Sequence, residues 1–290
     1  MTAPAERPGP EQFGARPANA GPLTARSAAA PHGPLGPPFP EPAGYRTMLL
    51  AYVRLEVRRT LRDGGFVIMG VIMPVTMYLL FTNLGVGDGT YKSDVAQYTM
   101  IGMAAYGALG AALAVGAGVA EDRGRGWLRQ LRVTPLSPLQ AVIGRAATAG
   151  VTVLPAIVAV LLAGRLVNGV RLDLWQWAAA GALLWVGTIP FTLLGLGNGY
   201  GLTAQTTGVV SMACMMGLSV IGGLWIPAAA FPHWLREVSR WTPTARFGDL
   251  GWSVLEHHGP GMGTVTVLAG WLLVFAGYAV VSYRRGARTA

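Results

Sequence analysis

The sequence predicts an all-α membrane protein with six transmembrane helices, and three observations indicate this class. Of the 290 residues, 52% are hydrophobic and only 12% are charged, whereas soluble domains average about 25% charged residues. Several long runs contain no charged residue. Along the chain, segments rich in basic residues alternate with segments that have few, and these segments connect the uncharged runs.

Asp, Glu, Lys and Arg are absent from residues 64–87, 95–120, 146–164, 174–235 and 257–283. A membrane-spanning helix needs about 20 predominantly apolar residues, so four runs fit one span each. The run 174–235 has room for two. The predicted spans are therefore about 66–84, 95–120, 141–163, 174–197, 207–226 and 264–283.

The basic residues predict the orientation of these spans. Only Lys92 among the 22 basic residues is a lysine. Thirteen basic residues lie just before the first span, between the second and third spans, or after the last, and six lie in the alternate segments. By the positive-inside rule, both termini and residues 121–145 are expected in the cytoplasm of a plasma-membrane protein. This distribution explains the net charge of +9 without a nucleic-acid partner.

Residues outside the predicted spans divide into a tail, a surface helix and a C-terminal tail. Residues 1–44 contain 11 of the 20 prolines and no apolar period, so we expect a disordered cytoplasmic tail. The transmembrane domain is expected over 45–285, followed by a cytoplasmic tail over 286–290. The only cysteine, Cys214, falls inside a span, which excludes an intrachain disulfide.

An amphipathic helix is predicted just before the first span, over residues 45–62. Its apolar residues share one arc, and Arg54, Arg58 and Arg62 recur at i+4 beside that arc. An Arg-rich amphipathic helix before a span is typical of one that lies on the membrane surface. It can anchor the chain to lipid, form part of a docking surface for a partner, or do both.

Two glycine- and alanine-rich patterns concern helix packing. Ala104, Ala108, Ala112 and Gly116 recur at i+4 in the second span, which predicts close packing against another span or a second subunit. The segment Gly195–Gly201 has alternating glycines. No strand precedes it, so a dinucleotide-binding loop is excluded, and we interpret it as a cytoplasmic turn after the fourth span.

The segment 227–243 is too polar to span a membrane and too apolar for an ordinary loop. Trp234, Leu235, Val238 and Trp241 share one helical face, and Trp favours the membrane–water boundary. The sequence therefore predicts a re-entrant or interfacial outer helix before the last span.

The segment 121–137 is densely charged although it joins two apolar spans. A helix that began at Glu121 and Asp122 would place these carboxylates at its positive end. Its apolar side chains would suit a groove on a partner, its arginines could pair with acidic or backbone groups there, and Thr134-Pro135 would end it. The alternative is an amphipathic helix that faces lipid.

Chemistry that would make the chain an enzyme is missing from its sequence. It contains no G-x-x-x-x-G-K-[ST], and Lys92 has no glycine loop before it. It has no H-E-x-x-H, and the pair His257-His258 is more typical of a solvated loop than of a metal site. Apart from Arg145 near the start of the third, no Asp, Glu, Lys or Arg lies inside a predicted span, which argues against ion-driven transport. We expect no catalytic residue, no metal site and no cofactor bound by the chain itself.

Over about residues 45–285, this organisation resembles the ABC-2 type permeases, in particular the drug- and antibiotic-export branch that includes daunorubicin-resistance permeases. The most specific part is 121–140, with an acid, a basic–glycine step, Leu-Arg, and Thr-Pro-Leu before a span. The outer segment with Phe-Pro-His-Trp-Leu, residues 231–235, is also similar to the family's segment before the last span.

The resemblance implies the membrane subunit of an ATP-binding cassette exporter. It implies a second permease subunit, identical or paralogous, surrounding membrane lipid, and separate ATP-binding subunits that carry ATP and Mg. The implied substrates are amphipathic drugs, antibiotics or lipid-like molecules, with a polysaccharide or lipid-linked glycan as the alternative. The residues expected to couple to the ATPase are Glu121, Asp122, Arg123, Gly126, Trp127, Leu128, Arg129, Leu131, Arg132, Thr134 and Pro135, with a second docking surface at Arg54, Arg58 and Arg62.

Overall fold

The computed structural model describes residues 54, 58, 62, 64–83, 92–124 and 138–289. The chain divides into two units, residues 1–43 and residues 44–290, and every described residue lies in the second. The predicted tail over residues 1–44 and residues 125–135 of the predicted coupling segment therefore lie outside the described residues.

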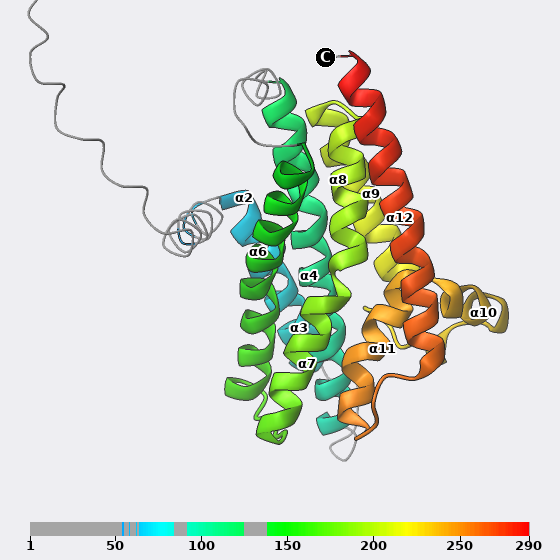
Figure 1. Cartoon of the computed structure of the whole chain (residues 1–290). Helices are drawn as coiled ribbons and strands as arrows, with labels where there is room; N and C mark the ends of the chain where they lie inside the picture. The colour runs from blue at the N-terminus through cyan, green and yellow to red at the C-terminus, as the bar shows by residue number, and fades with distance from the viewer. Residues whose placement is uncertain are drawn as a thin grey trace, which may run out of the picture. The chain divides into compact units, whose positions relative to one another are not determined.

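All regular structure in the described ranges is helical, which confirms the predicted all-α class (Figure 1). The short helices are α2 (Gly64–Phe66), the π-helix η1 (Val67–Ile72) and the 3₁₀ helix η2 (Ala228–Ala230). The others are α3 (Met73–Asn83), α4 (Lys92–Gly124), α6 (Pro138–Leu166), α7 (Leu174–Gly187), α8 (Ile189–Gly201), α9 (Ala204–Ile221), α10 (His233–Trp241), α11 (Pro243–Leu255) and α12 (Met262–Thr289).

Five helical stretches of the described residues are long and apolar enough to cross a membrane. They are Asp94–Gly124, Ala149–Leu166, Leu174–Gly201, Ala204–Ile221 and Met262–Gly286. The first predicted span corresponds to the shorter apolar stretch Val67–Asn83. At 1.5 Å per residue it is about 25 Å long, less than the roughly 30 Å hydrocarbon core of a bilayer. The first predicted span, and with it the count of six, therefore stays a prediction.

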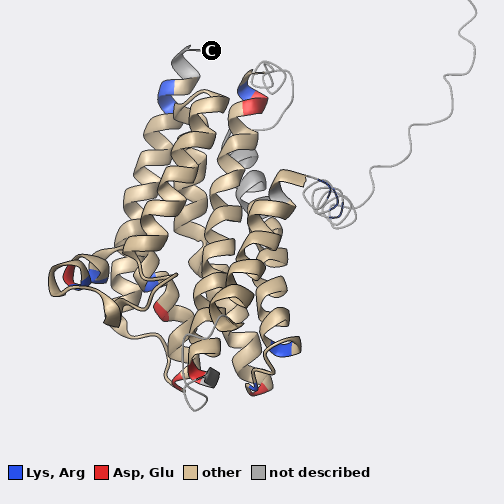
Figure 2. Ribbon diagram, turned by 180° about the vertical axis from the view of Figure 1, so that it is seen from behind, with Lys and Arg blue, Asp and Glu red and all other residues tan. Residues whose placement is uncertain are grey.

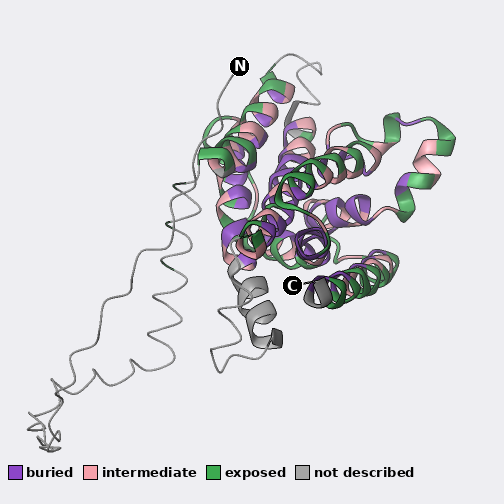
Figure 3. Ribbon diagram, turned by 90° about the horizontal axis from the view of Figure 1, so that it is seen from above, coloured by how far each residue is buried: buried purple, intermediate pink, exposed green. Residues whose placement is uncertain are grey.

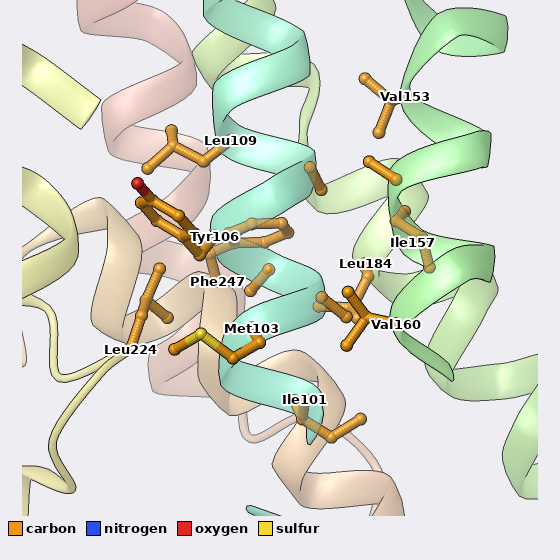
Figure 4. Packing of buried hydrophobic residues seen from close by; sticks show 14 of the residues in the cluster. Ile101, Met103, Tyr106, Leu109, Val153, Ile157, Val160, Leu184, Leu224 and Phe247 are labelled. Carbon is orange, nitrogen blue, oxygen red and sulfur yellow. The ribbon is translucent and has the colours of Figure 1, made fainter. Parts of the chain in front are cut away.

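Helix α4 occupies the centre of the packing and contacts α3, α6, α8, α9 and α11. Its small side chains make this possible, because Ala104, Ala108 and Ala112 are fully buried. Figure 4 shows larger α4 side chains, such as Met103 and Tyr106, among side chains of neighbouring helices. The small residues of α4 thus let several helices share one central neighbour.

Helices α4 and α8 approach each other closely at the α4–α8 glycine contact, formed by Gly116, Gly195 and Gly199. A Cβ atom on Gly116 would lie 2.0 Å from the Gly195 carbonyl oxygen, and one on Gly199 would lie 2.3 Å from the Gly116 carbonyl oxygen. A Cβ on Gly195 would lie 2.9 Å from the Ala112 carbonyl oxygen. Close packing through Ala112 and Gly116 is therefore confirmed, with a helix of the same chain as the neighbour.

This contact also corrects the interpretation of Gly195–Gly201 as a turn, which is wrong. These residues form the last turns of α8, and the predicted fourth span therefore ends later than residue 197. The glycines are needed for the approach of two backbones and do not reverse the chain. The reversal follows at Leu202, which is extended, and Thr203 then caps α9 by accepting a hydrogen bond from the Thr206 amide.

The predicted fourth span contains a break at Thr188, between α7 and α8. Pro190 lies at the start of α8, and proline lacks the amide hydrogen that would continue the α7 hydrogen-bond pattern. The Thr188 hydroxyl instead donates to the Trp185 carbonyl at 2.6 Å. The Thr188 amide donates to the same carbonyl at 3.2 Å, so the amide and the hydroxyl of Thr188 both help to end α7.

The segment before α12 contains more helix than the sequence analysis predicted. On α10, Trp234, Val238 and Trp241 are exposed, and the interfacial or re-entrant placement of this helix stays a prediction. Helix α11, which was not predicted, follows directly and is largely buried against α7, α12, α4 and α9. The sequence signal for α11 is the pair Thr242-Pro243, a capping residue followed by proline at the first helical position.

Charged residues gather at the ends of the long helices and in α10 and α11 (Figure 2). Between these places the helices carry apolar side chains, many of them exposed on α9 and α12 (Figure 3), such as Val209 and Leu273. An apolar exposed surface of this kind is expected where a helix contacts lipid or another membrane subunit.

Replacing Gly116 by alanine should separate α4 from α8, because the clashing atom is a backbone oxygen that cannot rotate away. We expect Gly116→Ala to lower the stability by about 1–3 kcal/mol, as overpacking does. The matched control is Gly118→Ala on the same helix, where a Cβ meets no atom within 4 Å. Thermal unfolding of the two variants in detergent tests this, and equal midpoints would contradict the role of the glycine contact.

Candidate functional site

Three of the eleven residues predicted to couple to a partner lie in the described part of the chain. Glu121, Asp122 and Arg123 form the last turn of α4, which continues to Gly124. No helix begins at Glu121, because these residues end a helix that began at Lys92. The other eight lie outside the described residues, namely Gly126, Trp127, Leu128, Arg129, Leu131, Arg132, Thr134 and Pro135.

Arg123 binds the end of α8. Its guanidinium Nη1 donates hydrogen bonds to the carbonyl oxygen of Gly199, at 3.0 Å, and to that of Tyr200. The last carbonyls of a helix lack partners within the helix, and a cation is favourable at this negative end. Arg123 was predicted to pair with a partner's groups. In the structure it pairs with backbone groups of its own chain.

Helix α12 reaches the same point through Gly286. A Cβ atom on Gly286 would lie 2.9 Å from the Tyr200 carbonyl oxygen and 3.3 Å from Arg123 Nη2. The ends of α4, α8 and α12 therefore meet at Arg123, Tyr200 and Gly286, which we call the Arg123 junction.

The second predicted docking surface is described at three positions. Arg54, Arg58 and Arg62 are helical and exposed, as expected from their i+4 spacing. Their contact with a partner or with lipid stays a prediction.

A polar cluster that the sequence analysis missed connects α8, α9 and α12. Asn198 is buried, and its Nδ2 donates to Ser211 Oγ at 3.2 Å. The Tyr278 hydroxyl donates to Asn198 Oδ1 at 3.1 Å, and the Thr207 hydroxyl lies 3.3 Å from the Asn198 carbonyl oxygen. The sequence signal for this cluster is Asn198, an asparagine inside a run without charged residues. It was missed because Gly195–Gly201 was interpreted as a turn outside the span.

An ionic site that the sequence analysis also missed lies on α11, outside the five candidate spans. Arg246 Nη1 lies 2.9 Å from Asp249 Oδ2, and the Thr264 hydroxyl lies 3.5 Å from the same oxygen. Burial raises the pKa of the Asp249 carboxyl, and Arg246 and Thr264 partly counteract this by lowering it. The i, i+3 spacing of Arg246 and Asp249 is the signal that a prediction of α11 would have used.

Metal-binding groups are sparse in the described part of the chain, where no cluster of three or more His, Cys, Asp or Glu occurs. His257 and His258 are exposed. The His257 Nε2 atom lies 3.5 Å from Gln176 Nε2, so its nearest polar side chain is an amide and not a metal-binding carboxylate.

The Asn198 cluster can be tested by a double-mutant cycle of Asn198→Ala and Tyr278→Phe. Each variant removes one side of the 3.1 Å hydrogen bond. We expect a coupling energy of about 0.5–1.5 kcal/mol, the range measured for hydrogen bonds between membrane helices. Unfolding in detergent–denaturant mixtures measures it, and strictly additive effects would show that the hydrogen bond does not connect α8 to α12.

The raised pKa of Asp249 predicts a pH dependence of stability. Because burial makes the folded state hold this proton more tightly than the unfolded state, the associated stability is lost as the pH rises from 3.8 through the raised folded value. The thermal midpoint of the wild type minus that of Asp249→Asn should fall across this window. Glu237→Gln, which removes an exposed ion-paired carboxylate, is the matched control. A difference that rises with pH would show that Arg246 outweighs burial.

Comparison with known proteins agrees with this architecture. A family model described as ABC-2 type transporter matches residues 47–250. The chain is also similar to the Bacillus subtilis (strain 168) protein named "Putative transport permease YvfS", with 24% identity over 221 residues that make up 76% of this chain and 90% of that relative. Both findings confirm the family resemblance of the sequence and fit a multi-pass membrane protein that forms part of a transporter. The chain belongs to the ABC-2 type transporter family.

Proposed function

We propose that the chain is the membrane-spanning permease subunit of an ATP-binding cassette exporter. It moves an amphipathic drug, antibiotic or lipid-like substrate out of the cell with ATP that a separate subunit hydrolyses. The family match over residues 47–250 is the observation that carries this proposal. The missing nucleotide-binding motif supports a separate ATPase, which carries the ATP and Mg.

In this proposal the subunit has six spans, with both termini and the Arg123 junction on the cytoplasmic side of the plasma membrane. The basic residues near that junction, which include Arg123, Arg284 and Arg285, support this orientation. Two such subunits, identical or paralogous, face each other. The exposed apolar side chains of α9 and α12 provide surface for a second subunit and for lipid.

The proposed mechanism starts where α4 ends. ATP binding by the partner displaces the segment 121–135 and the amphipathic helix over 45–62. Because α4 leads directly into the first of these and packs against α3, α6, α7, α8, α9 and α11, its displacement changes the packing around it. The opposed spans then open inward or outward, and the substrate leaves the cell.

The proposal predicts that Leu128→Asp combined with Leu131→Asp abolishes export and partner binding while the protein still inserts in the membrane. Two buried carboxylates without counter-charges make docking in an apolar groove unfavourable. The measurement is co-purification of the tagged protein from native membranes in mild detergent, with ATP hydrolysis and export assayed.

A matched control changes two apolar residues at the opposite ends of the helices. Leu166 and Val167 are exposed there, so Leu166→Asp with Val167→Asp should leave the ATPase bound. If the wild type brings down no ATPase, the exporter assignment fails. If the ATPase stays bound to the Leu128→Asp, Leu131→Asp variant, the docking segment is wrongly placed. Export of a lipid-linked glycan in place of an amphipathic drug would favour the alternative substrate class.

A further inference from the structure

Arg123 lies where the end of α4 meets the ends of two helices far away in the sequence. Its guanidinium binds the Gly199 and Tyr200 carbonyl oxygens of α8. Gly286 of α12 is so near that a Cβ there would lie 3.3 Å from Arg123 Nη2. A side chain at position 286 would thus collide with the α8 carbonyl, at 2.9 Å, and crowd the arginine. The missing side chain at Gly286 therefore leaves the room that the Arg123 guanidinium occupies.

The hydrogen bonds of Arg123 supply something that the α4–α8 glycine contact does not. Van der Waals contact between the glycine backbones sets how close the two helices lie, but it is not directional. Hydrogen bonds from a charged donor are directional and stronger than neutral ones. Arg123 therefore fixes the position of α4 along α8 at the end where α4 leads into residues 125–137.

The α8 end is in turn connected to α9 and α12. Asn198, one residue before Gly199, hydrogen-bonds to Ser211 of α9 and Tyr278 of α12. The close approach of Gly197 to the Tyr278 ring, where a Cβ would lie 2.4 Å from Cδ1, adds contact between α8 and α12. A displacement of the α8 end therefore carries α9 and α12 with it.

We propose that Arg123 is a positioning residue that transmits the movement of α4 to α8, α9 and α12 when the ATPase partner binds ATP. This inference rests on the proposed function. It assigns Arg123 a role inside the chain in place of the partner contact that its sequence position suggests. Its Nη1 is already bonded to two carbonyl oxygens, so a partner would have to break those charge-assisted bonds to bind the same atom.

The test uses the full complex in liposomes and follows the movement without a transported substrate. Spin labels replace Gln205, which is exposed at the start of α9, and Val167, which is exposed at the opposite ends of the helices. Cys214, the only native cysteine, is replaced by serine. The distance between the labels is measured with and without Mg-ATP and vanadate, together with ATP hydrolysis and partner co-purification.

We expect the nucleotide to shift this distance in the wild type and in Arg284→Met, which removes an exposed arginine of α12 near the same helix ends. In Arg123→Met the shifted population should fall about tenfold, the factor that loss of a charge-assisted hydrogen bond produces in an equilibrium. Hydrolysis and partner binding should persist. Arg123→Lys keeps the charge but lacks the planar fork, so an intermediate shift is expected, and this variant decides the question if Arg123→Met fails to fold.

Four other outcomes are possible, and each would overturn either the role of Arg123 or the proposed function. An undiminished shift in both Arg123 variants overturns the inference, and so does a wild-type complex that hydrolyses ATP without any shift. Loss of the partner from Arg123→Met overturns it too, since Arg123 would then be a docking residue, while the proposed exporter function stands. A wild type without an ATPase partner removes the proposed function itself.

Discussion

Backbone contact between α4 and α8 sets the spacing of the other helices. In a membrane, lipid tails are as apolar as the side chains, so helices associate mainly through close packing and a few hydrogen bonds. The Gly116 and Gly195 backbones meet without room for a Cβ atom. Since α4 also contacts α3, α6, α9 and α11, a change in the α4–α8 distance would disturb the packing of all of them.

Asn198 and Asp249 are polar side chains in this packing whose hydrogen-bond partners are present. A buried amide or carboxylate without a partner costs several kcal/mol in an apolar environment, and the partners of Asn198 and Asp249 come from other helices or from one turn away. Asn198 binds groups of α9 and α12, and Asp249 binds Arg246 and Thr264. These two clusters lie toward opposite ends of the helices.

Much of the fold could be predicted because membrane insertion depends on local composition. Charge-free runs of sufficient length identified the long apolar helices, and the small residues of α4 identified the close packing around Ala112 and Gly116. Family membership could be predicted from the charged segment and its neighbours. These features can be recognised in the local sequence, because a span needs a minimum apolar length and the helix period determines which residues share a face.

Tertiary packing decided what periodicity leaves ambiguous. The glycines of 195–201 suit a turn or a close helix contact equally well, and only the position of α4 selects the contact. The sequence of α11 is too short and too mixed in polarity to indicate a membrane span. The helix is buried only because α7, α12, α4 and α9 pack against it. Arg123 suits a partner or the end of a helix, and Gly199 and Tyr200, more than 70 residues away, decided its hydrogen bonds. Length and charge pattern determined the class of protein, whereas contacts between distant residues determined its polar clusters.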